Sequence, residues 1–368
     1  VEKVCDATEF PATPQLGYIT RNDNYDNAYN NAAALVAGEA TESELKAAYT
    51  TLRREYENLD ICKPQAGKFY TIANNGNYIT GSTTNDGKIA LSTTNDANAI
   101  YYFDGSHLLA YSTGLYIGLN GSDWAFEAVG TAANNISTVE FSASTVTAGE
   151  LSIYCGGRWL HNTDNAYVNR CSNNTCGAAH SWKVVEVTSL PVAISAARYT
   201  TLYAPVALEI DANVEAYVVS EIQSSSVLLE QVTGVVPAET GLIIKGNQGE
   251  YSFNIGGDAT AEITTNELKG TVAKSLITPD ANTTCYVLAN GTSGVGLYKA
   301  SLNKDANGAT VAENGVAFIN NAYKVYLPVE KAPAQAARAL TFRFIGTTEI
   351  ENVETTDNGQ QTTVIYDL

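Results

Sequence analysis

A four-residue pattern of glycine, any residue, an aromatic and an aliphatic residue occurs three times in the first half of the chain. The copies lie at Gly76–Ile79, Gly114–Ile117 and Gly157–Leu160, which are 38 and 43 residues apart. Each copy follows a strand-like segment and is closed by another apolar one. No unit of about 40 residues can bury its apolar face alone. Three units of four short strands each are typical of a β-trefoil closed around a pseudo-threefold axis.

The segment before the repeats has helical periodicity. Apolar residues recur at helical spacing through residues 21–60. Gly38 is a natural end for the first helix, and Thr41 with Glu44 forms a capping box for the second. We therefore expect an extended lead-in and a helical hairpin over residues 1–65. Because two such helices bury little apolar surface alone, we expect the hairpin to dock on a neighbouring domain.

Strand patterns continue after the repeats. Short segments with apolar residues at every second position are separated by Asn-Gly turns, and they indicate a β-sandwich over residues 189–345. Residues 346–368 then form a polar linker and one more strand-like segment, Thr363–Leu368. The predicted fold is mainly β: an N-terminal α-helical hairpin, a β-trefoil over residues 66–188, and then the β-sandwich.

Charge and composition narrow the partners. The 368 residues include 39 acidic and 21 basic side chains, a net charge of −18, which repels nucleic acid and anionic membrane surfaces. No apolar run approaches the ~20 residues of a spanning helix. The polar residues are largely Asn, Thr, Ser, Tyr and Gly, as in extracellular β proteins. Since the chain starts at Val1 without a signal peptide, we expect a mature or trimmed product that is secreted or on a bacterial outer surface.

The cysteines predict disulfides rather than a metal site. No Cys-x-x-Cys pair occurs, and the chain has only three histidines. Cys5 and Cys62 bracket the helical segment, so we expect them to pair. We expect Cys155 to pair with Cys171 or Cys176, and Cys285 is isolated in the sequence.

Catalytic motifs are absent from the sequence. There is no Gly-x-Ser-x-Gly, no P-loop and no His-Glu-x-x-His, and the histidines are His107, His161 and His180. No carboxylate pair stands out as the acid and base of a glycosidase, and no Asp-x-Asp-x-Asp run suggests calcium. We therefore expect a protein with no catalytic residues, no cofactor and no metal.

A sugar-binding site requires less: an aromatic face and a few amides or carboxylates. Two segments offer both. The candidate ligand-binding residues are Asn120, Asp123 and Trp124 in one segment, and Trp159, His161, Asp164 and Asn165 in the other.

Three of the aromatic residues occupy equivalent positions in the repeats. Tyr78, Tyr116 and Trp159 are therefore expected to be core residues that cap the trefoil barrel. Trp124 has no equivalent in the other units, so it is the better candidate for an exposed binding residue.

The third unit resembles a ricin-type lectin repeat. It contains Gly157–Asn162, Val168–Cys171 and Ser181–Val184, which are similar to the family's Gly-Lys-Cys-Leu-Asp, its later Cys and its closing Gln-x-Trp. The resemblance implies a carbohydrate-binding trefoil. The family holds sugar hydroxyls with an Asp after the Leu, and the matching positions here are Thr80, Gly118 and His161. This departure predicts weak binding at most.

The chain also resembles a layout of Bacteroidetes surface proteins. The similarity is carried by Lys68–Ile72 after the hairpin, by Tyr199–Val206 and by Val236–Gly246. Thr363–Leu368 resembles the first strand of a C-terminal secretion and sorting domain, whose missing remainder would provide surface attachment. Such layouts accompany glycan-degrading enzymes, lectin-like modules and adhesins.

Three functions follow as expectations. The leading one is a non-enzymatic secreted or cell-surface protein that binds a glycan or another surface polymer, or adheres, through the trefoil. A structural or adhesion component that makes protein–protein contacts is the second. The non-catalytic part of a larger glycan-degrading hydrolase is the third.

Overall fold

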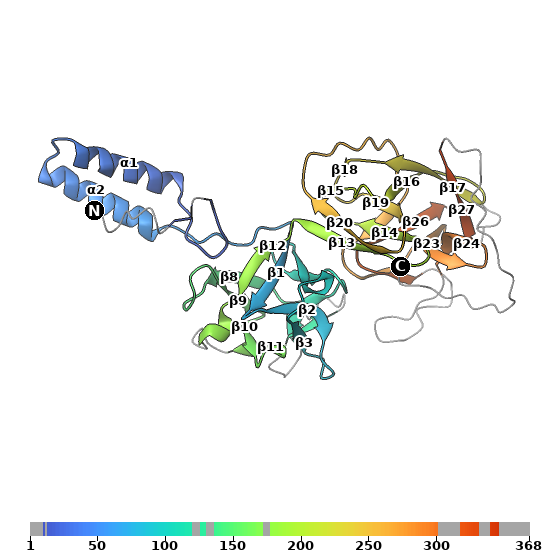
Figure 1. Cartoon of the computed structure of the whole chain (residues 1–368), viewed down its shortest axis with the longest axis horizontal. Helices are drawn as coiled ribbons and strands as arrows, with labels where there is room; N and C mark the ends of the chain where they lie inside the picture. The colour runs from blue at the N-terminus through green and yellow to red at the C-terminus, as the bar shows by residue number, and fades with distance from the viewer. Residues whose placement is uncertain are drawn as a thin grey trace.

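The computed structural model describes residues 10–11, 13–119, 126–129, 136–171, 177–300, 317–330 and 339–345. A helical hairpin, a first β domain and a second β domain follow one another along the long axis (Figure 1). The predicted fold class, mainly β with an N-terminal helical hairpin, is confirmed. None of the described helices has both the length and the apolar character needed to cross a bilayer.

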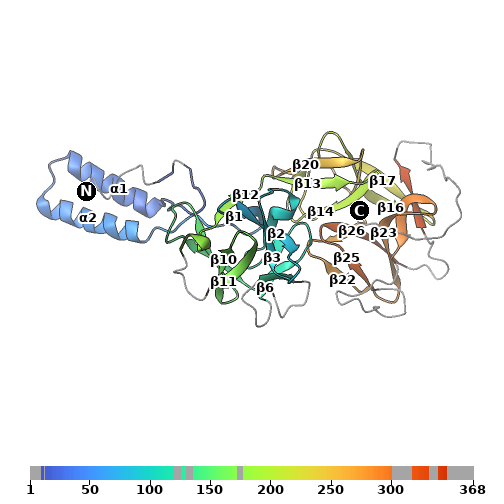
Figure 2. The same cartoon turned by 60° about the horizontal axis from the view of Figure 1, so that its bottom comes forward.

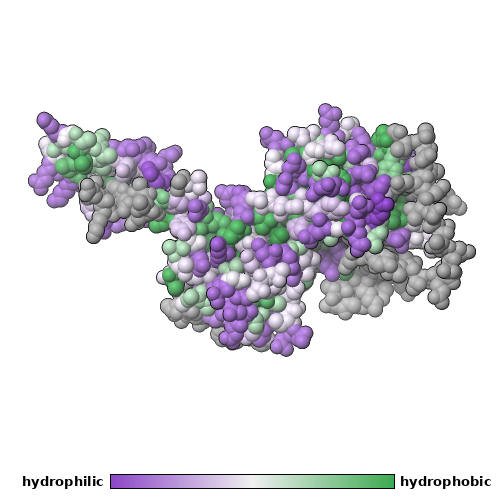
Figure 3. Space-filling view, viewed as in Figure 1, coloured by the Kyte–Doolittle hydropathy of each residue, from purple (hydrophilic) through white to green (hydrophobic). Residues whose placement is uncertain are grey.

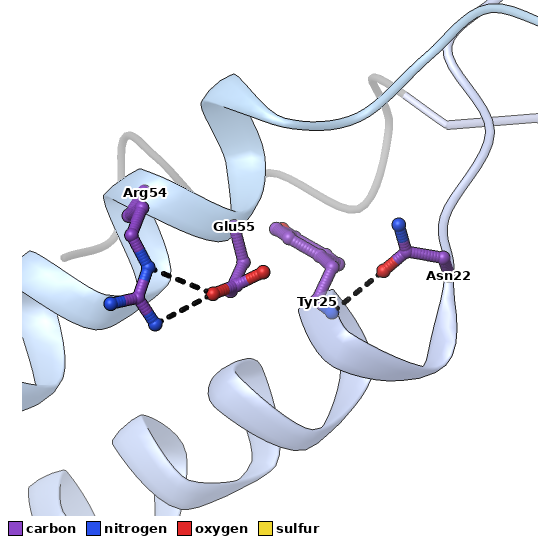
Figure 4. Close-up of polar contacts among 4 residues, drawn as sticks. All are labelled: Asn22, Tyr25, Arg54 and Glu55. Carbon is purple, nitrogen blue, oxygen red and sulfur yellow. Dashed lines mark hydrogen bonds and ion pairs between the residues drawn. The ribbon is translucent and has the colours of Figure 1, made fainter.

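The hairpin consists of α1 (Asp23–Ala37) and α2 (Glu42–Glu57). The predicted capping box at Thr41 and Glu44 is present. At the start of α1, the Asn22 side chain accepts a hydrogen bond from the Tyr25 backbone N–H at 2.9 Å, and Figure 4 shows this cap beside the ion pair of Arg54 and Glu55 on α2. Both helices therefore begin where side chains satisfy their free N–H groups.

The hairpin has a core of its own, so the prediction that it docks on a neighbouring domain is wrong. Phe10 completes this core from outside the helices, with its ring 5.3 Å from that of Tyr25. Figures 1 and 2 both show the hairpin projecting away from the β domains. The bridges Leu16–Cys62 and Ile19–Ile61 pair the two segments that flank the hairpin, and Leu16 and Ile61 pack against the trefoil core. The buried residues of the hairpin are Tyr25, Ala28, Ala32, Ala48 and Leu52.

The first β domain is a trefoil by its strand pairing. Strand β1 pairs with β4 and β12, β4 with β5, and β8 with β9. The ring is completed by the bridge Leu151–Trp182 and by the hydrogen bond from Val139 N to Ser106 O. Three hairpins, β2–β3, β6–β7 and β10–β11, cover it. The strands are β1 (Lys68–Asn74), β2 (Asn77–Thr83), β3 (Ile89–Ser92), β4 (Ile100–Phe103), β5 (Leu108–Ala110), β6 (Tyr116–Leu119), β7 (Phe126–Val129), β8 (Val139–Ala143), β9 (Leu151–Cys155), β10 (Arg158–Thr163), β11 (Tyr167–Cys171) and β12 (Lys183–Glu186).

The three repeats occupy equivalent places in the trefoil, but the expected core residue is wrong by one position. The aromatic residue of each repeat pairs with the preceding strand: Tyr78 with Ala73, Tyr116 with Leu109, and Trp159 with Tyr154. These aromatic side chains are only half-buried. The aliphatic residue after each of them is fully buried in the trefoil core, at Ile79, Ile117 and Leu160. Because side chains alternate along a strand, the aliphatic residue faces inward and the aromatic one outward.

Both predicted disulfides are absent, because one cysteine of each pair is a free thiol. Cys62 and Cys155 are free thiols, so the expected Cys5–Cys62 bond and the expected bond from Cys155 to Cys171 or Cys176 are wrong. Cys155 faces the trefoil core, where burial raises the pKa of its thiol to about 12. Backbone hydrogen bonds from Gly17 to Cys62 and from Cys62 to Tyr18 tie down the lead-in instead. Cys171 is disulfide-bonded, and Cys285 is a buried free thiol.

The second β domain packs strands on both faces of its central sheet. A four-stranded sheet, β13-β20-β15-β18, covers one face of β14, β16 and β19. The other face packs against β23, β24, β26 and β27, which belong to the same nine-stranded sheet, so that this sheet folds over on itself. The strands are β13 (Ser189–Ile194), β14 (Tyr199–Tyr203), β15 (Leu208–Glu209), β16 (Glu215–Ile222), β17 (Ser226–Val232), β18 (Val235–Val236), β19 (Gly241–Lys245), β20 (Gly249–Ile255), β21 (Lys269–Thr271), β22 (Ser275–Ile277), β23 (Thr283–Gly291), β24 (Gly294–Lys299), β25 (Phe318–Asn320), β26 (Lys324–Glu330) and β27 (Ala339–Phe344). The segment Thr363–Leu368 lies outside the described residues.

An aromatic interface joins the trefoil to the second β domain. Tyr323 is buried between Phe69 and Tyr111, with ring centroids 6.1 Å and 4.7 Å away. The Tyr111 hydroxyl donates to the Pro191 carbonyl at 2.8 Å. Gly114, in the β5–β6 turn, accepts a hydrogen bond from the backbone of Lys274 at 3.1 Å. One hydrophobic cluster thus continues from one domain into the other, and Figure 3 shows apolar surface along the upper rim of the trefoil near the junctions.

Candidate functional site

A groove of about 510 Å³ opens on the trefoil where the third unit meets the first. Four connections form it: the β1–β2, β8–β9 and β10–β11 turns and the 3-10 helix η3 (Gly177–His180) before β12. The lining is polar apart from two alanines. The lining residues are Asn74, Asn75, Thr147, Glu150, Asn162, Asp164, Asn165, Ala178 and Ala179.

Two of these turns need residues that tolerate a left-handed backbone. Asn75 and Gly76, between β1 and β2, have φ values of 49° and 76°. Asp164 and Asn165, after β10, have φ values of 53° and 57°. Asn, Asp and Gly are the residues that adopt this conformation at least cost. The same chemistry that makes the turns therefore places amide and carboxylate groups at the rim of the groove.

A chain of buried amides holds the walls together. The Asn74 side chain donates to the carbonyls of Ala178 at 2.7 Å and Ser181 at 2.6 Å. Its own carbonyl accepts from Asn162 Nδ2 at 2.7 Å. The Asn162 amide also donates to Asn165 Oδ1 at 2.9 Å and accepts from the Asn165 backbone N–H at 3.0 Å. The two turns and η3 are therefore one hydrogen-bonded unit.

Two carboxylates belong to the lining, Asp164 and Glu150. Asp164 is exposed at its turn, and Glu150 is half-buried. Partial burial raises the pKa of Glu150, and Thr147 and Lys183 oppose that rise. Among the described residues, the lining contains no Lys or Arg. The groove can thus accept hydrogen bonds from hydroxyl groups of an uncharged ligand and disfavours an anionic one.

Two histidines lie beside the groove. His180 is the last residue of η3, and its ring meets that of His161 edge to face, with centroids 5.4 Å apart. His161 Nδ1 is 3.2 Å from the Thr163 hydroxyl. Burial lowers the pKa of both imidazoles, and the nearby Asp164 carboxylate opposes the effect at His161. Both shifts favour the neutral form of the ring, and the pKa of His180 falls to about 4.

The predicted site residues separate into three groups. Asp164 and Asn165 line the groove, and His161 lies beside it. Trp159 is not part of the lining; its ring packs on Tyr154 with centroids 5.0 Å apart. The candidates Asn120, Asp123 and Trp124 lie outside the described residues.

Two of the three positions that match the lectin family's Asp, Thr80 and Gly118, are buried. Thr80 is 2% exposed, and its hydroxyl donates to the Ala90 carbonyl at 2.8 Å. Gly118 is buried as well.

Sequence reasoning missed Asn74, Asn162 and Glu150. The Asn75-Gly76 turn was the available signal for the first of them, because it marks the end of β1 beside Asn74.

Neither a metal cluster nor a related protein explains the site. Within the described part of the chain, no group of three or more His, Cys, Asp or Glu residues could hold a metal ion. No protein-family model and no curated protein matches the chain. Among solved structures it is similar to the crystal structure of Cry35Ab1, at 9% identity over 72% of this chain and 90% of that one, with a TM-score of 0.27. Similarity at this level supports no conclusion about function.

Proposed function

We propose that the protein is a non-enzymatic binding protein whose trefoil groove holds an uncharged, polyhydroxylated ligand, a glycan or another surface polymer. The observation that carries the proposal is one groove whose walls are fixed by the hydrogen-bonded unit of Asn74, Asn162 and Asn165 and whose lining includes the carboxylates of Asp164 and Glu150. A few polar groups held in fixed positions are what orients a ligand such as a sugar.

The composition of the groove limits the affinity for a single sugar. Each hydrogen bond to a charged acceptor contributes about 1.5–3 kcal/mol, and the lining offers two carboxylates, Asp164 and Glu150. In the described part of the chain, no aromatic ring belongs to the lining to stack on a sugar face. A binding free energy near −4 kcal/mol corresponds to a Kd of about 1 mM. Useful attachment to a polymer would then depend on many copies displayed together.

The location and the absence of catalysis are part of the same proposal. The chain resembles exported Bacteroidetes surface proteins, which supports a secreted or outer-surface location. The absence of sequence motifs for nucleophilic, carboxylate or metal catalysis supports a non-enzymatic role.

Glycan arrays followed by calorimetry on monomeric protein test this proposal. We expect weak binding to neutral oligosaccharides that falls at least tenfold in Asp164→Asn, a change that removes the charge and suits the left-handed backbone. Asp86→Asn is the matched control, because Asp86 is exposed at the β2–β3 turn and is not part of the lining. Absence of any glycan binding, or turnover of a glycan or peptide, would overturn the proposal.

An adhesive role through protein contacts is the second candidate. It is favoured by the hairpin, which projects from the β domains with its own core (Figure 2). Removal of residues 1–60 should then abolish attachment to a protein-coated surface and leave glycan binding unchanged.

A further inference from the structure

His180 occupies a position that suits only an uncharged ring. It is 2% exposed, and neither of its ring nitrogens has a hydrogen-bond partner among the residues that the structure describes. A buried imidazolium without an acceptor loses its hydration without compensation. His180 is also the residue directly after Ala178 and Ala179, which line the groove. Its charge state is therefore linked to the position of one groove wall.

Among the described residues, His161 is the titratable group that shifts the pKa of His180, and the carboxylates of the groove lining, Glu150 and Asp164, provide no counter-charge for it. From β10 it meets His161, a second imidazole, whose charge would repel a proton on His180. Strand β9 carries the titratable residues Tyr154, which packs on Trp159, and Cys155, a neutral thiol in the trefoil core. From β1 the neighbour of η3 is the uncharged Asn74. Asp164 acts on His161. Burial and His161 together lower the pKa of His180 to about 4.

We propose that protonation of His180 opens the groove, so that acid releases its ligand. A protonated ring must reach water, which requires the segment that carries it to leave its place. Asn74 then loses its bonds to the carbonyls of Ala178 and Ser181, and Asn162 loses a fixed partner. Release of ligand depends on the proposed function, whereas the opening of the groove does not.

The direction and size of the effect follow from linkage. In the open state His180 regains its ordinary pKa of about 6.5, so the open state takes up the proton first. The equilibrium constant for opening does not change with pH well above pH 6.5. Below pH 6.5 it grows up to about tenfold for each pH unit, until the pH reaches the lowered pKa of His180 in the closed state. Between pH 7 and pH 4.5 we expect opening to increase by up to about a hundredfold.

Hydrogen exchange on the intact chain without ligand tests the proposal. After correction for intrinsic rates, amides of residues 177–183 should exchange up to about a hundredfold faster at pH 4.5 than at pH 7. His180→Phe should remove this step, because the new ring is apolar and of similar size. His107→Phe is the matched control, since His107 lies in the same trefoil, is more exposed and contacts Asp104. The His107→Phe variant should keep the faster exchange at pH 4.5.

Either of two results would overturn the proposal: no acid-dependent exchange in the natural chain, or the same dependence in His180→Phe. If that variant does not fold, an NMR titration of the His180 ring in the natural chain provides the test. The ring must stay neutral in the closed form to below pH 5. A titration midpoint near pH 6.5 without faster amide exchange would refute the proposal. Since no ligand is present, a failure to find glycan binding leaves this test intact.

Discussion

Replacing Asn74 by alanine tests how much the amide chain stabilises the trefoil. Asn74 makes three hydrogen bonds, two as a donor to the carbonyls of Ala178 and Ser181 and one as an acceptor from Asn162. Each contributes about 1 kcal/mol net, and partners left unsatisfied in a buried site add to the loss. We expect Asn74→Ala to lower the free energy of unfolding of the trefoil by about 3 kcal/mol.

Urea denaturation followed by tryptophan fluorescence measures this loss in the correct domain. All three tryptophans, Trp124, Trp159 and Trp182, belong to the trefoil segment, and Trp182 is fully buried in its core. With a urea m-value of ~2 kcal/mol per M, the midpoint should fall by about 1.5 M. Asn95→Ala is the control, because Asn95 is exposed in a trefoil loop, and its effect should stay within about 0.5 kcal/mol.

A double-mutant cycle with Asn162→Ala separates the Asn74–Asn162 bond from the rest of the network. Because the two side chains share one hydrogen bond, their effects should be non-additive by about 1 kcal/mol. The reasoning would be refuted if Asn74→Ala cost no more than the Asn95 control, or if the two alanine substitutions were strictly additive.

Three further predictions concern other parts of the chain. Gly114→Ala should weaken the contact between the trefoil and the second β domain by about 2 kcal/mol or more, because a Cβ there would lie 2.1 Å from the Cβ of Ala322. Limited proteolysis should detect the loosened domains. Gly76→Ala is the control, because Gly76 has a similar positive φ and open space around it. Leu52→Ala should destabilise the hairpin by about 3 kcal/mol, seen as early loss of helical circular dichroism with the tryptophan transition unchanged. Peptide mapping after unfolding without reductant should find Cys155 alkylated as a free thiol, and a disulfide that includes it would contradict the structure.

The repeats predicted the trefoil because period and turn chemistry are local properties of the sequence. The turn at Asn75 and Gly76 has the left-handed backbone that these residues suggest. The orientation of the strands was harder to predict. A shift of one residue turns every side chain of a strand to the other face, and the Gly-x-aromatic-aliphatic pattern carries an apolar residue at both positions. Trp159 was therefore expected in the core, which Leu160 occupies.

The site was predicted in part for a related reason. Asp164 and Asn165 were found because they lie in one turn of the third unit. Asn74 and Asn162 were not, since they are separated by 88 residues in sequence and belong to different units. Only closure of the barrel brings their amides within hydrogen-bond distance. A single sequence contains no local pattern that reports such a contact.

The second β domain limits how many equivalent sites the trefoil can present. The groove uses the β1–β2 turn of the first unit, at Asn74 and Asn75. A rotation by one unit places the β5–β6 turn at the same position, and there Gly114 and Tyr111 contact the second domain through Lys274 and Pro191. A ligand at that rotated position would have to displace the second domain. The trefoil therefore cannot offer three equivalent grooves, and we infer that strong attachment to a polymer must come from several copies of the protein.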